Sequence, residues 1–269
     1  MAQNILSRNN VKVAGKGERV MLFAHGFGCD QNMWRFVAPA FENDYQTVLF
    51  DYVGSGRSDL RAYNRERYSS LNGYAEDILD ICRALALEKE VILVGHSVSA
   101  MIGLLAAINQ PGLFHRLIFV SPSPRYLNDA PGYVGGFERG DIQELLETMD
   151  RNYIGWANLL APVVMKNPDR PELTSELTES FCSTDPTIAR RFAEVTFLSD
   201  NRGDLSKLRV PSLILQCSED LIAPVSVGEY LHRHVPQSTL RVMKATGHCP
   251  HMSAPEETRA LIQDYVRHG

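Results

Sequence analysis

Short apolar segments alternate with helical patterns along most of this chain, and that alternation constrains the fold more than any other feature. The segments typical of buried strands span residues 20–24, 47–51, 91–94, 117–121, 212–217 and, more weakly, 239–243. Between them, residues 74–87 repeat apolar side chains every three or four positions, and 98–109 form a second helical pattern. Strands separated by helices favour an α/β fold, in which a parallel sheet is covered on both faces.

The alternation breaks between residues 125 and 204. Helix-like stretches in this region are punctuated by prolines and by clusters of aspartate, asparagine and serine, and a strand pattern resumes after Pro211. We therefore expect a single domain with an insertion. Residues 1–124 and 205–269 would form the α/β core, and residues 125–204 would form a helical lid over the carboxyl edge of the sheet.

The net charge and the apolar runs of the chain indicate which kinds of partner to expect. The chain has 269 residues, a formal net charge of −5 and a sequence pI of about 5.9. A mildly acidic protein has no electrostatic attraction to nucleic acid or to an anionic membrane, so we expect neither as a partner. No apolar run approaches the roughly 18 residues that span a bilayer. The first residues also lack the basic start and apolar core of a signal peptide.

The spacing of the cysteines indicates the cellular compartment, and the glycine-rich loops indicate whether a cofactor is bound. The five scattered cysteines fit reduced thiols better than a disulfide framework, and we expect a cytoplasmic protein. His248, Cys249 and His251 lie close together without a second ligand pair, so no metal is expected. The glycines of FDYVGSGRSDL lack the further residues of a phosphate or dinucleotide loop. We therefore expect no cofactor.

Ser97 lies where a predicted buried strand meets a predicted helix, in the segment VILVGHSVSA. This is the context of a nucleophile elbow, a strained turn that exposes a serine hydroxyl above the sheet. The residues two positions before and after must be small, because strand and helix pass close together there. Gly95 meets that requirement. Ser99 stands where the common pattern G-x-S-x-G has its second glycine, and we expect slightly looser packing.

A serine before a helix is also a common N-cap, so the partners of Ser97 decide its interpretation. A serine nucleophile needs a histidine to take its proton and a carboxylate to orient that histidine. Asp220 and His248 follow Ser97 in the chain order that this fold requires, each just past a predicted strand. Strand ends of a parallel sheet share one edge, where α/β proteins bind ligands. The sequence therefore predicts a catalytic triad of these three residues.

Each partner of Ser97 has a rival nearby. Glu219 is adjacent to Asp220, but Asp220 has the D-x-x-x-P context that ends at Pro224. His251 competes with His248, but His248 comes first on the loop after the last predicted strand. We therefore prefer Asp220 and His248.

A tetrahedral intermediate also needs two preorganised N–H donors for its oxyanion. One comes from the residue after the nucleophile, which is Val98. The segment FAHGFGCDQNMW follows an early predicted strand, and its Phe27 N–H is the second candidate, because flanking glycines let the backbone approach the oxygen. His25 in the same loop is interpreted as a structural hydrogen-bonding residue.

Several longer motifs carry a family resemblance: HGFGCDQNMW, FDYVGSGRSDL, GYAEDILDICRAL, VGHSVSA, YLNDAPGYVGGFE, NYIGWA, FCSTDP, PSLILQCSEDLIAP and GHCPHMS. With them, the chain resembles the α/β-hydrolase superfamily over nearly all its length. Within that superfamily it is similar to the bacterial RsbQ group, which activates a general-stress sigma factor, and to the plant strigolactone and karrikin receptor hydrolases. The segments between residues 125 and 204 make the likeness specific.

The resemblance implies the α/β-hydrolase fold, with a mostly parallel eight-stranded sheet flanked by helices and a four-helix lid over an apolar pocket. It places Ser97 at the base of that pocket. It also implies that the substrate-binding residues include Phe27, Phe137, Trp156 and Phe197, with Val98 beside them. Leu160 stands where the plant relatives carry an aromatic residue.

The function implied by the resemblance is that of a carboxylesterase-like serine hydrolase for a small hydrophobic ester or lactone. It would act in stress signalling and sigma-factor regulation, with a sensor-domain phosphatase as partner. The alternative is a ligand receptor with slow or vestigial hydrolysis. A lyase or a cofactor-free oxygenase would use the same triad, and the fold alone does not distinguish these chemistries.

Overall fold

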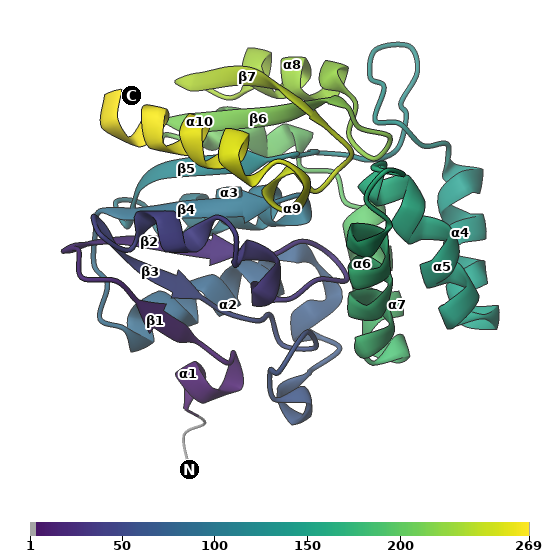
Figure 1. Ribbon diagram of the computed structural model, residues 1–269, viewed down its shortest axis with the longest axis horizontal. Coiled ribbons are helices and arrows are strands. Elements are labelled where there is room, and N and C mark those ends of the chain that lie inside the picture. Colours follow the sequence, from purple (N-terminus) through teal and green to yellow (C-terminus); the bar gives the residue numbers. More distant parts are fainter. Residues whose placement is uncertain (1–3, 269) are drawn as a thin grey trace.

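The computed structural model describes residues 4–268 and contains a seven-stranded sheet in the order β1-β3-β2-β4-β5-β6-β7 (Figure 1). Neighbouring strands run parallel, except that β1 pairs antiparallel with β3. The strands are β1 (Lys12–Ala14), β2 (Arg19–Ala24), β3 (Tyr45–Leu49), β4 (Val91–His96), β5 (Phe114–Val120), β6 (Ser212–Glu219) and β7 (Ser238–Thr246). The expected α/β architecture is therefore confirmed.

The expected number of eight strands is wrong for the described residues, because the sheet there has seven. Strand β1 forms one edge of the sheet, and the chain just before it folds into the short helix α1 (Ile5–Arg8). Arg8 binds the carboxylates of Asp77 and Asp80 on the next helix. These bonds hold residues 5–8 beside that helix, so this segment does not form a further strand next to β1.

Helices cover both faces of the sheet. The α-helices of the core are α2 (Leu71–Ala84), α3 (Val98–Asn109), α8 (Val225–His234), α9 (Pro250–Ser253) and α10 (Pro255–His268). The 3-10 helices are η1 (Gln31–Trp34), η2 (Ala38–Phe41), η3 (Leu60–Ala62), η4 (Arg67–Ser69) and η5 (Arg202–Lys207). In β4, Leu93 belongs to the buried cluster that includes residues of α2, α3 and α8, whereas Ile92 and Val94 belong to the cluster that includes residues of α10, η1 and η2. The alternation is that of a strand buried on both faces.

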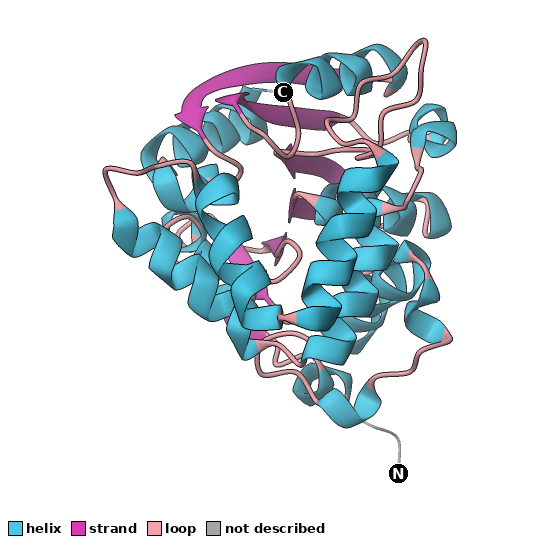
Figure 2. Cartoon of the chain, turned by 90° about the vertical axis from the view of Figure 1, so that its right-hand side faces the viewer, coloured by secondary structure: helices cyan, strands magenta, loops and turns pink. Residues whose placement is uncertain are grey.

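Four helices stand between β5 and β6: α4 (Arg139–Arg151), α5 (Tyr153–Met165), α6 (Pro171–Ser183) and α7 (Pro186–Phe197). They lie together at one end of the molecule, on the right of Figure 1, and Figure 2 shows helices in front of the strands at that end. Their inner side chains pack with the loops after β2 and β5 and with the loop that carries His248 and Cys249. This helical insert is therefore placed over the carboxyl edge of the sheet. Its expected limits, residues 125 and 204, stay a prediction.

Within residues 4–268, none of the helices combines the length and the apolar character needed to cross a bilayer.

Candidate active site

Ser97 occupies the turn between β4 and α3 in a backbone conformation that L-residues rarely adopt, with φ of 56° and ψ of −122°. The strain persists because its surroundings are closely packed. A Cβ atom at Gly95 would lie 2.5 Å from the carbonyl oxygen of Ser99, so strand and helix approach too closely there for any side chain. The sequence VGHSVS thus forms the elbow that its pattern predicted.

The three predicted triad residues converge at the carboxyl edge of the sheet. The Nε2 atom of His248 lies 2.7 Å from Ser97 Oγ, and its Nδ1 atom lies 2.7 Å from Asp220 Oδ2. Asp220 cannot donate when ionised, so His248 Nδ1–H donates to it and Nε2 is left to accept the serine proton. The geometry is that of a serine activated by an oriented base.

Backbone contacts hold the carboxylate and the imidazole in place. The second oxygen of Asp220 accepts from the N–H groups of Ile222 and Ala223, at 2.8 and 3.1 Å. His248 donates its own N–H to the carbonyl of Val164 on α5, at 2.8 Å. The insert therefore supports the loop that carries the candidate base.

The structure places both rival residues away from Ser97. Glu219 is exposed and pairs with Lys166. His251 is fully buried between the rings of Trp34 and His96, with centroid distances of 4.6 and 4.3 Å, and its own ring nitrogens have no hydrogen-bond partner. Burial lowers the pKa of His251 to about 3, so it is neutral.

His96 precedes the serine and holds the base through the backbone. Its Nε2–H donates to the carbonyl of His248 at 2.8 Å. Burial, followed by the neighbouring histidines His251 and His248, lowers the pKa of His96 well below its usual range. A neutral His96 adds no positive charge beside His248, so it does not oppose protonation of the base during a reaction.

A small cavity lies over Ser97, and its volume of about 30 Å³ suffices for a water molecule or two. Of the predicted pocket residues, Phe27 and Phe197 line it, as does Leu160. Trp156 and Phe137 stand behind this lining, where Trp156 packs on Phe27 and Phe137 on Phe197. An ester of a hydrophobic acid is larger than this cavity, so the helical insert or the lining side chains must shift to admit one.

Sequence reasoning missed part of the lining. The further residues are Cys29, His96, Tyr126, Val164, Leu177, Phe181, Thr196, Ile222 and Cys249. His96 occupies the variable position before Ser97 in the elbow pattern and Cys249 follows His248, but neither pattern marks these positions as pocket lining. Most of the others lie on loops or helices that meet Ser97 only in three dimensions. Most are also apolar, which matches both a core and a pocket, so composition gave no signal.

Among the residues that were missed, Tyr126 brings a polar group to Ser97 itself. Its hydroxyl lies 3.2 Å from Ser97 Oγ. Because the single proton of Ser97 is directed to His248, Tyr126 is the donor in this contact. Burial raises its pKa above the usual range, so the hydroxyl stays protonated.

The two predicted oxyanion donors flank Ser97. Val98 is the first residue of α3, so its N–H has no partner within that helix. Phe27 lies on the loop after β2 and lines the cavity together with Ser97. That loop lies close to the elbow, because a Cβ atom at Gly26 would lie 3.4 Å from Ser97 Cβ.

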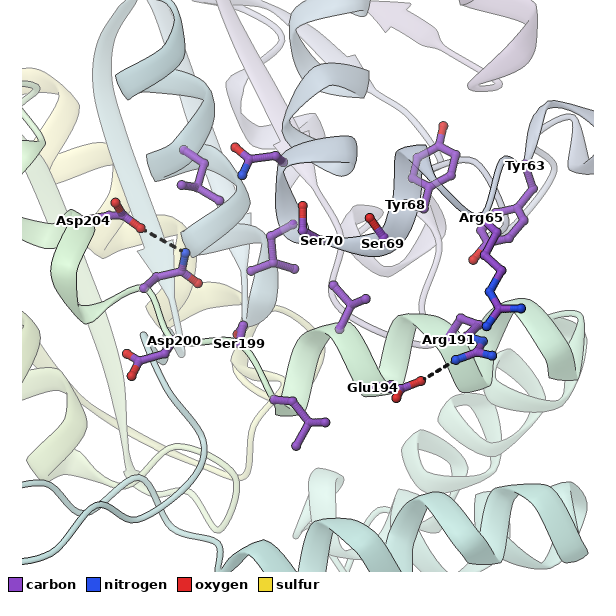
Figure 3. A pocket seen from close by; sticks show the side chains of 16 residues that line it. Tyr63, Arg65, Tyr68, Ser69, Ser70, Arg191, Glu194, Ser199, Asp200 and Asp204 are labelled. Atoms are coloured by element: carbon purple, nitrogen blue, oxygen red, sulfur yellow. Dashed lines mark hydrogen bonds and ion pairs between the residues drawn. The ribbon is translucent and has the colours of Figure 1, made fainter.

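A larger groove of about 610 Å³ lies elsewhere, between the η4–α2 junction and the segment from α7 to η5 (Figure 3). Polar groups on its walls pair with one another: Arg191 donates to Glu194, and the Asn201 amide donates to Asp204. Ser97 does not line this groove. The smaller cavity, with its reactive serine, is therefore the candidate active site.

Comparison with known proteins relates this chain to hydrolases and esterases, in agreement with the geometry of the site. The model of the alpha/beta hydrolase family matches residues 21–261. A probable esterase of Oryza sativa subsp. japonica is 40% identical over 262 residues, covering 97% of this chain and 96% of that protein. The strigolactone esterase D14 of Arabidopsis thaliana is 39% identical over 261 residues, covering 97% of each chain.

A plant receptor and a solved bacterial structure are also similar to this chain over nearly its whole length. The karrikin insensitive 2 receptor CA of Petunia hybrida is 40% identical over 261 residues, covering 97% of this chain and 96% of that protein. The structure of a hydrolase from Oleispira antarctica is 45% identical, with a TM-score of 0.96 and coverage of 99% of this chain and 97% of that chain. The likeness therefore includes the helical insert as well as the sheet.

Proposed function

The chain belongs to the alpha/beta hydrolase family and is a serine esterase, and from this premise we propose that it binds and slowly hydrolyses a small hydrophobic ester or lactone as a ligand receptor. The observation that carries the proposal is the hydrogen-bonded series Ser97–His248–Asp220 beneath a nearly closed apolar cavity.

In the proposed reaction, His248 Nε2 takes the proton of Ser97 as Oγ bonds to the carbonyl carbon of the ester. The electron pair of the carbonyl π bond moves to the oxygen and forms an oxyanion. This oxyanion accepts hydrogen bonds from the N–H groups of Phe27 and Val98. Asp220 stabilises the imidazolium through Nδ1–H. His248 then passes the proton to the leaving alcohol as the tetrahedral intermediate collapses to an acyl-enzyme.

Water completes the cycle. His248 removes a proton from a water molecule as the water oxygen attacks the acyl carbon. It then donates that proton to Ser97 Oγ as the second tetrahedral intermediate collapses and releases the acid. With a lactone, the leaving alcohol remains part of the acyl chain throughout, and the product released at this step is a hydroxy acid. Bonds made and broken thus balance without any cofactor.

The first prediction tests the nucleophile. We expect Ser97→Ala to lower turnover of 4-nitrophenyl butyrate on the order of 10⁴-fold or more, because the residual rate would come from binding and the oxyanion donors alone. Mass spectrometry after treatment with a fluorophosphonate should place the added mass on Ser97.

The matched control is Ser212→Ala. Ser212 is another fully buried serine, and its hydroxyl donates to the carbonyl of Val210 at the amino end of β6. This variant should keep full turnover. Undiminished hydrolysis by Ser97→Ala, or probe mass on another residue, would contradict the proposed mechanism.

Two observations favour a receptor over an enzyme of high throughput. The relatives at about 40% identity are named as strigolactone esterases and karrikin receptors. The cavity over Ser97 is too small for such ligands without rearrangement. Binding would therefore select or induce a more open arrangement of the helical insert, which we propose acts as the lid over the site and couples ligand binding to its outer surface.

Turnover and ligand binding distinguish the two functions. A receptor should show a kcat well below the roughly 10 s⁻¹ that is typical of enzymes, together with a shift in melting temperature caused by lactone ligands in the Ser97→Ala variant. Fast turnover without any such shift would favour a metabolic esterase.

The resemblance to bacterial stress regulators adds a finer proposal, in which a phosphatase with a sensor domain is the partner and sigma-factor regulation in the stress response is the output. The free state of all five cysteines supports a reducing compartment such as the cytoplasm. Co-purification of such a phosphatase, and its loss on substitution of exposed residues of the helical insert, is the test.

A further inference from the structure

Ser99 fills the elbow position that more commonly holds glycine, and its hydroxyl makes two contacts in a fully buried setting. Ser99 Oγ donates to the carbonyl oxygen of His25 in a short hydrogen bond. The hydroxyl of Tyr52 lies 2.9 Å from the same oxygen. Because the serine proton is already used, Tyr52 is the donor in the second contact. Ser99 thus links the elbow helix to the loop that carries Phe27.

His25 continues the connection from Ser99 toward the candidate oxyanion donor. Its Nε2 atom accepts the backbone N–H of Tyr52 at 3.2 Å, which leaves Nδ1 as the protonated nitrogen. That Nδ1–H donates to the carbonyl of Gly26 at 2.8 Å. Burial lowers the pKa of His25, in accord with a neutral ring that has one donor and one acceptor.

The carbonyl of Gly26 and the N–H of Phe27 belong to one planar peptide unit, in which they point in opposite directions. A group that holds the carbonyl therefore also aims the N–H. The Gly26 carbonyl accepts from His25 and also from the N–H of Cys29, at 3.3 Å. Ser99 holds the carbonyl of the preceding peptide unit, so two consecutive peptides are fixed by their oxygens.

We propose that Ser99, supported by Tyr52, is a positioning residue that aims the Phe27 N–H at the oxyanion. The inference rests on the proposed hydrolase function. It accounts for the serine at this elbow position, because a glycine would leave the His25 carbonyl and the Tyr52 hydroxyl without this partner in the buried turn. Neither Ser99 nor Tyr52 contacts the substrate in this role.

The decisive variant is Ser99→Ala, compared with wild type and with Ser212→Ala. We expect kcat for 4-nitrophenyl butyrate to fall about 10- to 100-fold, because a displaced donor loses part of the 10²- to 10³-fold that one donor supplies. KM should stay within about twofold, since the ground-state ester carries no oxyanion.

An oxyanion mimic separates positioning from general loosening. A trifluoromethyl ketone forms a tetrahedral adduct with Ser97 whose oxygen occupies the oxyanion site, so its inhibition constant should rise in parallel with the fall in kcat. The Ser212→Ala control loses a buried serine hydroxyl remote from this loop and should change neither quantity.

Tyr52→Phe is the second variant, because it removes only the hydroxyl that donates to Ser99. It tests the positioning role if Ser99→Ala does not fold. We expect a three- to tenfold fall in kcat with unchanged KM. Unchanged kcat in the folded variants would overturn the positioning role while leaving the hydrolase function intact. Retained turnover by Ser97→Ala would instead overturn the hydrolase function itself.

Discussion

At the scale of single residues, Tyr126 alters the expected setting of the nucleophile. Ser97 Oγ contacts both His248 Nε2 and the Tyr126 hydroxyl, at 2.7 and 3.2 Å. The tyrosine ring packs against Phe197 of the helical insert, with a centroid distance of 5.2 Å. One polar group from the loop after β5 therefore reaches the reacting oxygen beside an otherwise apolar wall.

The prediction at this scale is that Tyr126→Phe lowers kcat/KM for short-chain esters about three- to tenfold. The variant removes one hydrogen bond at the reacting oxygen, which is worth about 1 kcal/mol, while it keeps the ring packing. Steady-state kinetics gives the ratio. The matched control is Tyr133→Phe, which removes another buried tyrosine hydroxyl, one that donates to the carbonyl of Arg125 and does not line the cavity. An unchanged kcat/KM in Tyr126→Phe would show that the contact has no effect on the reaction.

The sequence indicated Ser97, Asp220 and His248 because each lies in a short motif and their order along the chain is fixed by the fold. Tyr126 opens the segment YLNDAPGYVGGFE, which carries the family resemblance but does not mark a role for the tyrosine. Its contact with Ser97 spans 29 positions of the chain and depends on the path of the loop after β5. Contacts of this kind can be identified only when the arrangement of the strands in space is known.

At the scale of elements, α2 anchors two segments through a buried group of charges. Asp77 is fully buried and binds Arg8 of α1 at 3.0 Å and Arg67 of η4 at 2.9 Å. It also accepts from the hydroxyl of Tyr68 at 2.9 Å. Removing one partner from a buried charge network leaves the others without compensation.

We expect Asp77→Ala to lower the free energy of unfolding by about 3–5 kcal/mol, because Arg8 and Arg67 would lose their fully buried carboxylate and keep only the more exposed Asp80 as partner. Urea denaturation followed by circular dichroism measures the change. The neighbouring residue Glu76 pairs with Arg83 at the surface, so Glu76→Ala should change stability by less than about 1 kcal/mol. Equal effects of the two substitutions would contradict the structural role of Asp77.

Elements with strong periodicity were predictable, and weakly patterned ones were not. Helix α3 spans the residues expected for it, and the six predicted strands are present with ends displaced by at most three residues. Strand β1 has only three residues, Lys12–Ala14, and gives no apolar signal. Its place in the sheet comes from pairing with β3, which no local pattern encodes.

At the scale of the whole molecule, three buried histidines link folding to pH. His25, His96 and His251 are buried near the active site, and burial is the largest cause of the lowered pKa of each. Each ring is neutral when folded but has a pKa of about 6.5 when unfolded. The unfolded state therefore binds more protons as the pH falls below about 6.5, and the folded state loses stability.

His251 provides the test, because its pKa is lowered to about 3 and its nitrogens have no hydrogen-bond partner to lose. Between pH 6 and pH 4, His251→Phe should reduce the pH dependence of the unfolding free energy by about 1.4 kcal/mol per pH unit. Urea denaturation at several pH values measures this slope. At pH 8 the two proteins should not differ in slope, and identical slopes at every pH would contradict the assignment.

The separation of the three site residues along the chain has a consequence for biosynthesis. Ser97 emerges early during synthesis, but the imidazole that would activate it follows β7, the last strand along the chain. A nascent chain that still lacks β7 and His248 has no base beside Ser97, so it cannot hydrolyse an ester by this mechanism. Covalent tagging of Ser97 would, for the same reason, count only chains that have finished folding.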